Sequence, residues 1–156
     1  MLGEDNTEIS VGEFVEMLWE ECSHRGGAAL NELLRFGHFR GWLEDSDERH
    51  PETSLNRQTA ARIVHQFMVI ELRIQDIADI SAAQSLRDLY TCRVCANHIA
   101  QVYSRGIMRA QEMDEVNASL SAAASPAHPV LLFNHLAPVT RTEAQEIIIQ
   151  NLKSML

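Results

Sequence analysis

The sequence has few cysteines and few basic residues. Its three cysteines, Cys22, Cys92 and Cys95, are too few for the disulfide framework of a small secreted protein, so we expect reduced thiols. Lys and Arg total 13 against 22 Asp and Glu, and the formal net charge of −9 argues against direct binding to nucleic acid. An acidic surface can instead attract a basic partner.

Long apolar runs are absent as well. No stretch approaches the roughly 18 apolar residues of a membrane span, so we expect no membrane-embedded segment. The N-terminal residues MLGEDNTEIS lack the basic and apolar parts of a secretory signal, which predicts a cytoplasmic protein. Removal of a signal peptide from a longer precursor would place the protein at the cell surface instead.

Common catalytic motifs are also missing. The sequence contains no GxSxG, no phosphate-binding Walker loop, no dinucleotide-binding glycine motif and no HExxH. We therefore predict a protein that is not an enzyme and that requires no cofactor.

Three segments share one helical template, and they begin at Ser10, Asn56 and Thr140. In each, small or apolar residues stand four, seven, eight and twelve positions after the polar residue, which is the spacing of one helix face. A side-chain oxygen at the start can accept hydrogen bonds from N–H groups of the first turn. The apolar residues that precede these caps can pack back onto the first turn; they are Ile9, Leu55 and Val139.

A second template ends in glycine. The pattern that ends at Gly37 in ALNELLRFGHFRG returns at Gly106 in HIAQVYSRGIMRA, and we expect each glycine to end its helix in the left-handed conformation. The chain thus holds two helix–loop–helix units, 26–69 and 84–155, and a lone capped helix at 9–23.

Stacked units of this kind bury their apolar faces against one another. We predict a single all-α domain over residues 1–156, built as a bundle of about five main helices with pseudo-threefold character. The second unit carries an insertion at 111–129, rich in Ser, Ala and Pro, which is typical of a long surface loop.

These segments resemble the S-layer homology repeat, a helix–loop–helix module that commonly occurs in threes. The second unit carries the resemblance in IADIS, YSRGIM and FNHLAPVTRTEAQEIIIQNL, and the first unit follows the same order more loosely in GHFRG, Pro51 and LNRQTA. The resemblance implies a fold of such repeats and a module that binds bacterial secondary cell-wall polymer. It also implies that Arg57 and Arg141 contact acidic groups of the glycan, as a planar guanidinium can.

The third copy departs from the family pattern, because Val11 stands where the arginine belongs. The first unit has Thr59 where the acid belongs. Arginine is electrostatically unfavourable in the first turn of a helix, so another interaction must favour Arg57 and Arg141 there. Contact with a ligand and structural pairing with a nearby carboxylate both meet that requirement.

The segment CRVCANH has three interpretations. Helical spacing would place Cys92 and Cys95 on the apolar face that continues to Ile99, which favours buried core thiols. A zinc site would use these two cysteines with His98, and Cys22 or His24 could supply a fourth ligand. A redox-active CxxC is the remaining interpretation.

A group of aromatic and acidic residues surrounds the turn that follows the first glycine. It comprises Phe36, Phe39, Trp42, Glu44, Asp45, Asp47 and Glu48. An aromatic anchor with an acidic rim suits a protein interface, although the same aromatics can close the core. We expect recognition of a protein partner, as an adaptor or inhibitor, with wall-glycan binding as the alternative and a zinc or redox protein as the next.

Overall fold

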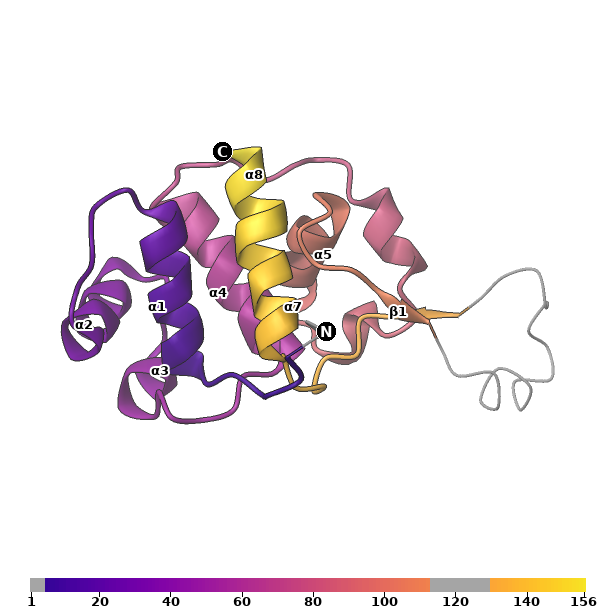
Figure 1. Ribbon diagram of the computed structural model, residues 1–156. Helices are drawn as coiled ribbons and strands as arrows, with labels where there is room; N and C mark the ends of the chain where they lie inside the picture. The colour runs from indigo at the N-terminus through magenta and orange to yellow at the C-terminus, as the bar shows by residue number, and fades with distance from the viewer. Residues whose placement is uncertain (1–4, 113–129) are drawn as a thin grey trace.

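The structure is a computed structural model that describes residues 5–112 and 130–156, and its architecture is all-α. Two of the three helices predicted to begin at a polar cap are α1 (Val11–Cys22) and α4 (Arg57–Ile70). The third is a continuous C-terminal helix, which Figure 1 shows beside α1. It consists of α7 (Arg141–Gln145), the π-helical η3 (Glu146–Leu152) and α8 (Lys153–Met155).

Each of these helices is capped by the predicted side chain. A side-chain oxygen accepts a hydrogen bond from the backbone N–H of the residue three positions on, which satisfies one donor of the first turn. The pairs are Ser10 with Glu13 at 3.1 Å, Asn56 with Thr59 at 2.9 Å and Thr140 with Glu143 at 3.1 Å. At α1 the carboxylate of Glu13 also accepts a hydrogen bond from Ser10 N–H at 3.1 Å, which completes a capping box.

The residues that precede the caps meet in a closed ring of backbone hydrogen bonds. The N–H of Ile9 donates to Val139 O at 3.1 Å, Val139 N–H donates to Leu55 O at 2.9 Å, and Leu55 N–H donates back to Ile9 O at 2.9 Å. All three side chains are fully buried. The starts of α1, α4 and α7 are therefore joined in one three-way junction, and their apolar faces contribute to one core.

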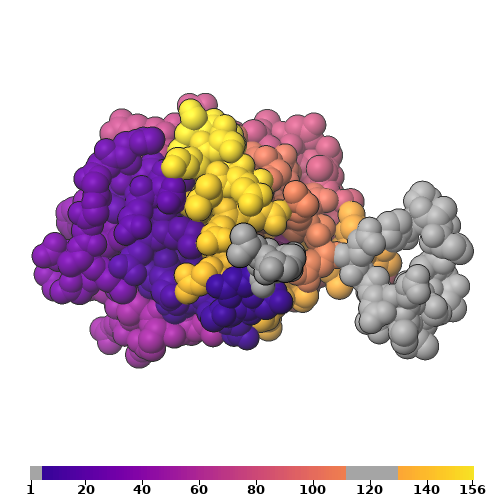
Figure 2. Space-filling model, in the orientation of Figure 1, coloured from indigo at the N-terminus to yellow at the C-terminus, as the bar shows by residue number. Residues whose placement is uncertain are grey.

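The remaining elements surround this junction. They are α2 (Leu30–Arg40), α3 (Asp45–Arg49), α5 (Ala96–Ser104), the 3₁₀ turns η1 (Ser81–Ser85) and η2 (Leu89–Thr91), and the two-residue strands β1 (Gln111–Glu112) and β2 (Leu131–Leu132). α5 packs against α4, and β1 pairs antiparallel with β2. Figure 2 shows the C-terminal helix as a strip along one face of the molecule.

Gly106 ends α5 as predicted. Its φ is 75°, a left-handed value that favours glycine, and its N–H donates to Tyr103 O at 3.0 Å. The next residue, Ile107, donates to Val102 O at 2.9 Å and is buried. This pair of hydrogen bonds is the Schellman motif.

The prediction that Gly37 ends its helix is wrong. α2 continues to Arg40, and Gly41, with a φ of 99°, ends it instead. Gly37 is needed for close packing, because a Cβ placed there would lie 2.5 Å from Leu43 Cδ1 and 3.1 Å from Trp42 Cζ2. The chain turns at Gly41, and the next two residues, Trp42 and Leu43, pack against α2 at Gly37, which has no side chain.

Two further sequence predictions concern membrane-spanning segments and the loop insertion at 111–129. Within residues 5–112 and 130–156, no helix is both long enough and apolar enough to cross a membrane. The predicted loop insertion at 111–129 begins with β1, and the rest of it, 113–129, lies outside the described residues.

Candidate functional site

Arg57, a predicted ligand contact, is buried inside the protein. It occupies the first position of α4 with an exposed fraction of 2%. Its Nε donates to Phe133 O at 2.7 Å, one terminal nitrogen pairs with Glu143, and the other donates to Arg109 O. Burial lowers the pKa of Arg57 to about 10, although the nearby carboxylates of Asp88 and Glu146 act in the opposite direction. Internal partners on all three guanidinium nitrogens make this arginine part of the structure.

Arg141 occupies the equivalent first position of α7 and is more accessible. Its side chain is 33% exposed, and it lies 2.6 Å from Glu13 and 3.5 Å from Asp5. The hydrogen bond from Arg141 is the main reason that the pKa of Glu13 lies below its ordinary value. Two carboxylates therefore already balance the charge of this guanidinium.

The two arginines follow one rule of pairing. Each stands first in its helix and pairs with the glutamate at the third position of the next helix in the ring: Arg57 of α4 with Glu143 of α7, and Arg141 of α7 with Glu13 of α1. The third pair would join Val11 to Thr59, and neither residue is charged. Val11 and Thr59 thus stand where the two halves of a third ion pair would be. The pairing of Arg57 and Arg141 with a glutamate of the next helix accounts for an arginine at each of these helix starts.

A hollow of about 230 Å³ lies beside Arg57, and the charged side chains that line it form ion pairs with one another. Arg109 also lines it and pairs with Glu146 at 2.9 Å, while Glu143 pairs with Arg57. An acidic glycan would have to displace these internal carboxylates before either guanidinium could bind it.

The predicted aromatic and acidic interface is only partly on the surface. The prediction is wrong for Trp42, which is fully buried: its ring packs 4.9 Å from Phe67, and its Nε1 donates to Glu71 at 2.9 Å. It is also wrong for Asp47, 3% exposed, whose carboxylate receives two hydrogen bonds from Arg62 at 2.8 and 3.0 Å. Gly37 explains the error for Trp42, because the close packing that it permits brings Trp42 and Leu43 into the core, whereas Asp47 is buried by its pairing with Arg62 of α4.

The other members of that group lie at different depths. Phe36 is half-buried against Trp19, with ring centroids 5.5 Å apart, and Glu48 is half-buried beside His38 at 2.7 Å. Phe39 is 86% exposed. Glu44 and Asp45 are exposed as predicted for an acidic rim.

The prediction of reduced core thiols at Cys92 and Cys95 is also wrong, because the two form a disulfide and are half-buried. The spacing argument assumed one continuous helix, whereas α5 begins only at Ala96 and the two cysteines form the turn before it. With the sulfurs bonded to each other, the zinc ligands predicted with His98 are not available as thiolates. Among the described residues, no group of three or more His, Cys, Asp or Glu is placed to hold a metal ion.

A chain of three polar side chains was not predicted from the sequence. Asp76 Oδ1 lies 2.6 Å from His65 Nε2, and His65 Nδ1 lies 2.8 Å from His98 Nδ1. Burial, assisted by the electrostatic effect of the neighbouring His65 and Arg62, lowers the pKa of His98 to about 4. No local sequence motif predicts this series of hydrogen bonds, because the two histidines come from different helices, α4 and α5.

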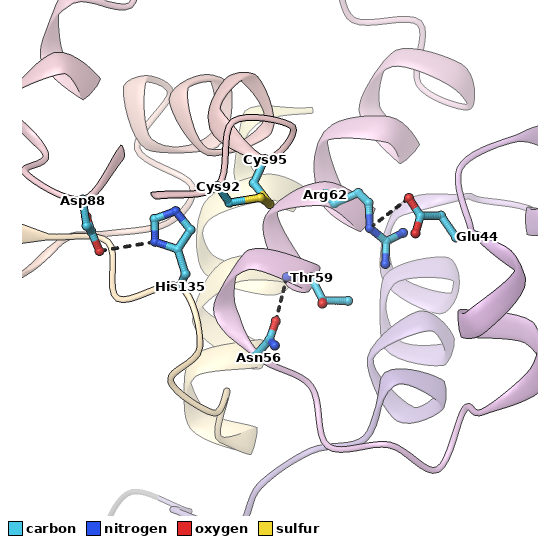
Figure 3. Close-up of a disulfide and its surroundings, with 8 residues drawn as sticks. All are labelled: Glu44, Asn56, Thr59, Arg62, Asp88, Cys92, Cys95 and His135. Atoms are coloured by element: carbon cyan, nitrogen blue, oxygen red, sulfur yellow. Dashed lines mark hydrogen bonds and ion pairs between the residues drawn. A yellow bond between two sulfur atoms is a disulfide. The ribbon is translucent and has the colours of Figure 1, made fainter. Parts of the chain in front are cut away.

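Two hollows lie along α4, and His98 lines both. The first, of about 380 Å³, is called the disulfide hollow; its walls include Glu44, Thr59, Arg62, Cys92, Cys95 and His98. The second, of about 540 Å³, is called the aliphatic hollow; its walls include Val69, Ile70 and Ile74, with His65, Asp76 and His98. Figure 3 shows the disulfide over the first turns of α4, between the Asp88–His135 pair and the Arg62–Glu44 pair.

Comparisons with protein-family models, with curated proteins and with solved structures found no match.

Proposed function

We propose that this protein binds a polypeptide partner along α4 and does so without catalysis. The observation that carries the proposal is the pair of hollows on this helix, one lined by aliphatic side chains together with polar ones and the other by polar groups and a disulfide. Binding sites in proteins combine an apolar concave surface with a few placed polar groups. An aliphatic side chain of the partner would occupy the aliphatic hollow, and its neighbouring residues would cross the disulfide hollow.

Exposed apolar residues flank these hollows. Val69 of the aliphatic hollow is 43% exposed, and Val94 of the disulfide hollow is 86% exposed. Partners commonly cover such side chains, because burying them removes apolar surface from water. Glu44 lies at the polar end, and with the net charge of −9 it favours a partner segment that carries basic residues.

Cell-wall polymer is the second candidate. The ring that joins the starts of α1, α4 and α7 agrees with the repeat organisation that the family resemblance implies. The internal pairing of Arg57 weighs against it, because an acidic sugar would replace Glu143 at the cost of leaving a carboxylate without its partner. Arg141, one-third exposed, is the better placed of the two arginines for such a contact.

The proposed compartment is the cytoplasm, with the cell surface as the alternative. The two compartments place different demands on the Cys92–Cys95 disulfide, since cytosolic disulfides are usually transient while those outside the cell persist. Rapid acid quenching of intact cells, followed by alkylation, measures which state is present.

Site-specific photo-crosslinking in the native host tests the proposed function. A photoreactive amino acid replaces Val69 or Val94 at the two hollows, and replaces Ile149, 38% exposed on the C-terminal helix, as the control. We expect one and the same protein to be crosslinked from Val69 and Val94 and not from Ile149. Changing Val69 to glutamate in the protein that carries the photoreactive residue at position 94 should abolish the product crosslinked from that position. If circular dichroism is unchanged, this loss locates the contact.

Two results would reject partner binding along α4. One is an identical set of products from all three positions. The other is retention of the protein on purified wall polymer that is lost in Arg141→Met, together with no crosslinked protein from Val69 or Val94, and this result would favour the second candidate.

A further inference from the structure

The Cys92–Cys95 disulfide is placed where another molecule can reach it. Both cysteines are half-buried and line the disulfide hollow, which α4 and the turn before α5 enclose together with Glu44. Thr59 and Arg62 of α4 form the facing wall. The third cysteine, Cys22, is fully buried, and burial raises its pKa to about 11. Of the three cysteines, the Cys92–Cys95 pair is therefore the one that an external thiol can reach.

The bridge has little to contribute to stability. Its cysteines are three positions apart, and a short loop restricts the unfolded chain less than a long one does. The turn is also closed by backbone hydrogen bonds, from Cys95 N–H to Cys92 O at 3.2 Å and from Ala96 N–H to Arg93 O at 3.3 Å. A role in exchange chemistry explains the bridge better than a role as a staple.

The two sulfurs occupy different positions relative to α5. Cys95 is the N-cap residue, and no side-chain oxygen caps this helix, whereas Ser10, Asn56 and Thr140 cap α1, α4 and α7. The first-turn N–H groups and the helix dipole stabilise a negative charge at this end. A thiolate at Cys95 is thus favoured over one at Cys92, and the sulfur with the more stable thiolate is the better leaving group.

A neutral histidine stands in the same hollow. His98, one turn after Cys95, lines the disulfide hollow and is held by His65, which Asp76 holds in turn. The ring is neutral near pH 7, because burial keeps its pKa at about 4. With a pKa of about 4, His98 is too weak a base to take the proton of an incoming thiol, so that proton passes to solvent.

We propose that the Cys92–Cys95 disulfide exchanges with a cysteine thiol of the partner bound along α4, an inference that rests on the proposed function. The partner thiol loses its proton to solvent, and its thiolate attacks Cys92 Sγ. A disulfide forms between the partner and Cys92 as the Cys92–Cys95 bond breaks, and the electron pair leaves on Cys95 as a thiolate at the start of α5. A second thiol of the partner can then displace Cys92, which leaves the partner oxidised to a disulfide and both cysteines reduced.

The chemistry is tested first on the purified protein with glutathione. The native chain is equilibrated in mixtures of reduced and oxidised glutathione, quenched with acid, alkylated and analysed by mass spectrometry. We expect reversible conversion between the disulfide and two alkylated cysteines, with unchanged circular dichroism and with Cys22 unmodified as an internal control. Reduction that occurs only in urea would overturn the proposal, as would a reduced protein that retains one zinc ion per chain in place of the disulfide.

The assignment of the leaving sulfur is tested with two single variants. Cys92→Ser leaves the Cys95 thiol and Cys95→Ser leaves the Cys92 thiol, so each can be alkylated alone across a range of pH. We expect Cys95 to react at least about tenfold faster than Cys92 at pH 6, because more of it is thiolate at that pH. Equal rates, or a faster Cys92, would refute the assignment.

The last experiment separates this inference from the proposed function. In the native host, the Cys92 thiolate of Cys95→Ser can attack the disulfide of the oxidised partner, which is the reverse of the exchange, and one partner sulfur leaves as a thiolate. Because Cys95 is absent, it cannot release the mixed disulfide through Cys92, and the adduct accumulates. We expect an adduct that a dithiol releases and that contains the protein crosslinked from Val69, and no such adduct in the double variant Cys92→Ser/Cys95→Ser. Crosslinking from Val69 without any adduct would overturn the exchange while partner binding stands. An adduct with a different protein would overturn the exchange as proposed for the partner on α4.

Discussion

Replacing the two equivalent arginines by methionine separates structural pairing from a surface role. Arg57 and Arg141 stand at the same position of their helices and differ in burial, so the same substitution removes similar chemistry from two environments. In Arg57→Met, Glu143 loses its partner and the carbonyl groups of Phe133 and Arg109 lose their donors. Breaking a buried ion pair from one side costs roughly 3–5 kcal/mol.

We expect the lower end of that range for Arg57→Met. The side chain of Glu143 is 23% exposed, so water can hydrate part of the charge that is left behind. A loss of about 3 kcal/mol corresponds to a fall in Tm of roughly 6–12 °C for a domain of this size. Arg141→Met should leave Tm close to the wild-type value, because exposed ion pairs contribute little to stability.

Urea unfolding followed by circular dichroism measures both variants, and a double variant shows whether the pair is the cause. In Arg57→Met/Glu143→Gln the charge left behind is removed, so the double variant should lose less stability than the two single variants together. Equal losses for Arg57→Met and Arg141→Met would refute the buried pairing, and additive losses in the double variant would show that Arg57 acts through other contacts.

Three further predictions follow from burial. Trp42→Ala should cost about 3–5 kcal/mol in urea unfolding, while Phe39→Ala, at an exposed aromatic, should leave the midpoint unchanged; a small loss for Trp42→Ala would contradict its place in the core. Burial lowers the pKa of His98 from 6.5 to about 4. As the pH falls below 6.5, the unfolded chain therefore gains a proton at His98 that the folded protein does not gain. Stability should fall by about 1–2 kcal/mol toward pH 4 after allowance for solvent screening. Unfolding measured between pH 7 and pH 5 should show a flatter slope for His98→Gln and an unchanged slope for the exposed His50→Gln, and identical slopes would show that His98 does not titrate in this way. Finally, the raised pKa of Cys22, about 11, predicts that a thiol reagent at pH 8 labels it only after unfolding, so rapid labelling of the native protein would show that this thiol is accessible.

The fold was predictable where the signals were local. The capped starts at Ser10, Asn56 and Thr140 were correct because a cap and its N–H partner are three residues apart. Gly37 was misinterpreted because glycine serves both for a left-handed turn and for close packing, and only the position of the returning chain distinguishes them.

The candidate site was less predictable. Cys92 and Cys95 were placed on a helical face because the pattern of apolar residues continues through them, yet α5 begins after them. An apolar period does not show where a helix begins when no oxygen-bearing cap marks the start. Trp42 was equally ambiguous, since an aromatic residue beside acids is expected both at an interface and at the edge of a core.

By itself, the sequence determined where the three capped helices begin and which of their faces are apolar. Hydrogen bonds and side-chain spacing within a few positions of each other decide those features. Only the tertiary structure decided that Arg57 pairs with Glu143, 86 positions away, that His65 meets His98, 33 positions away, and that the disulfide opens into a hollow beside α4. Such contacts depend on how the helices pack around the ring of Ile9, Leu55 and Val139, and no spacing within one segment encodes that packing.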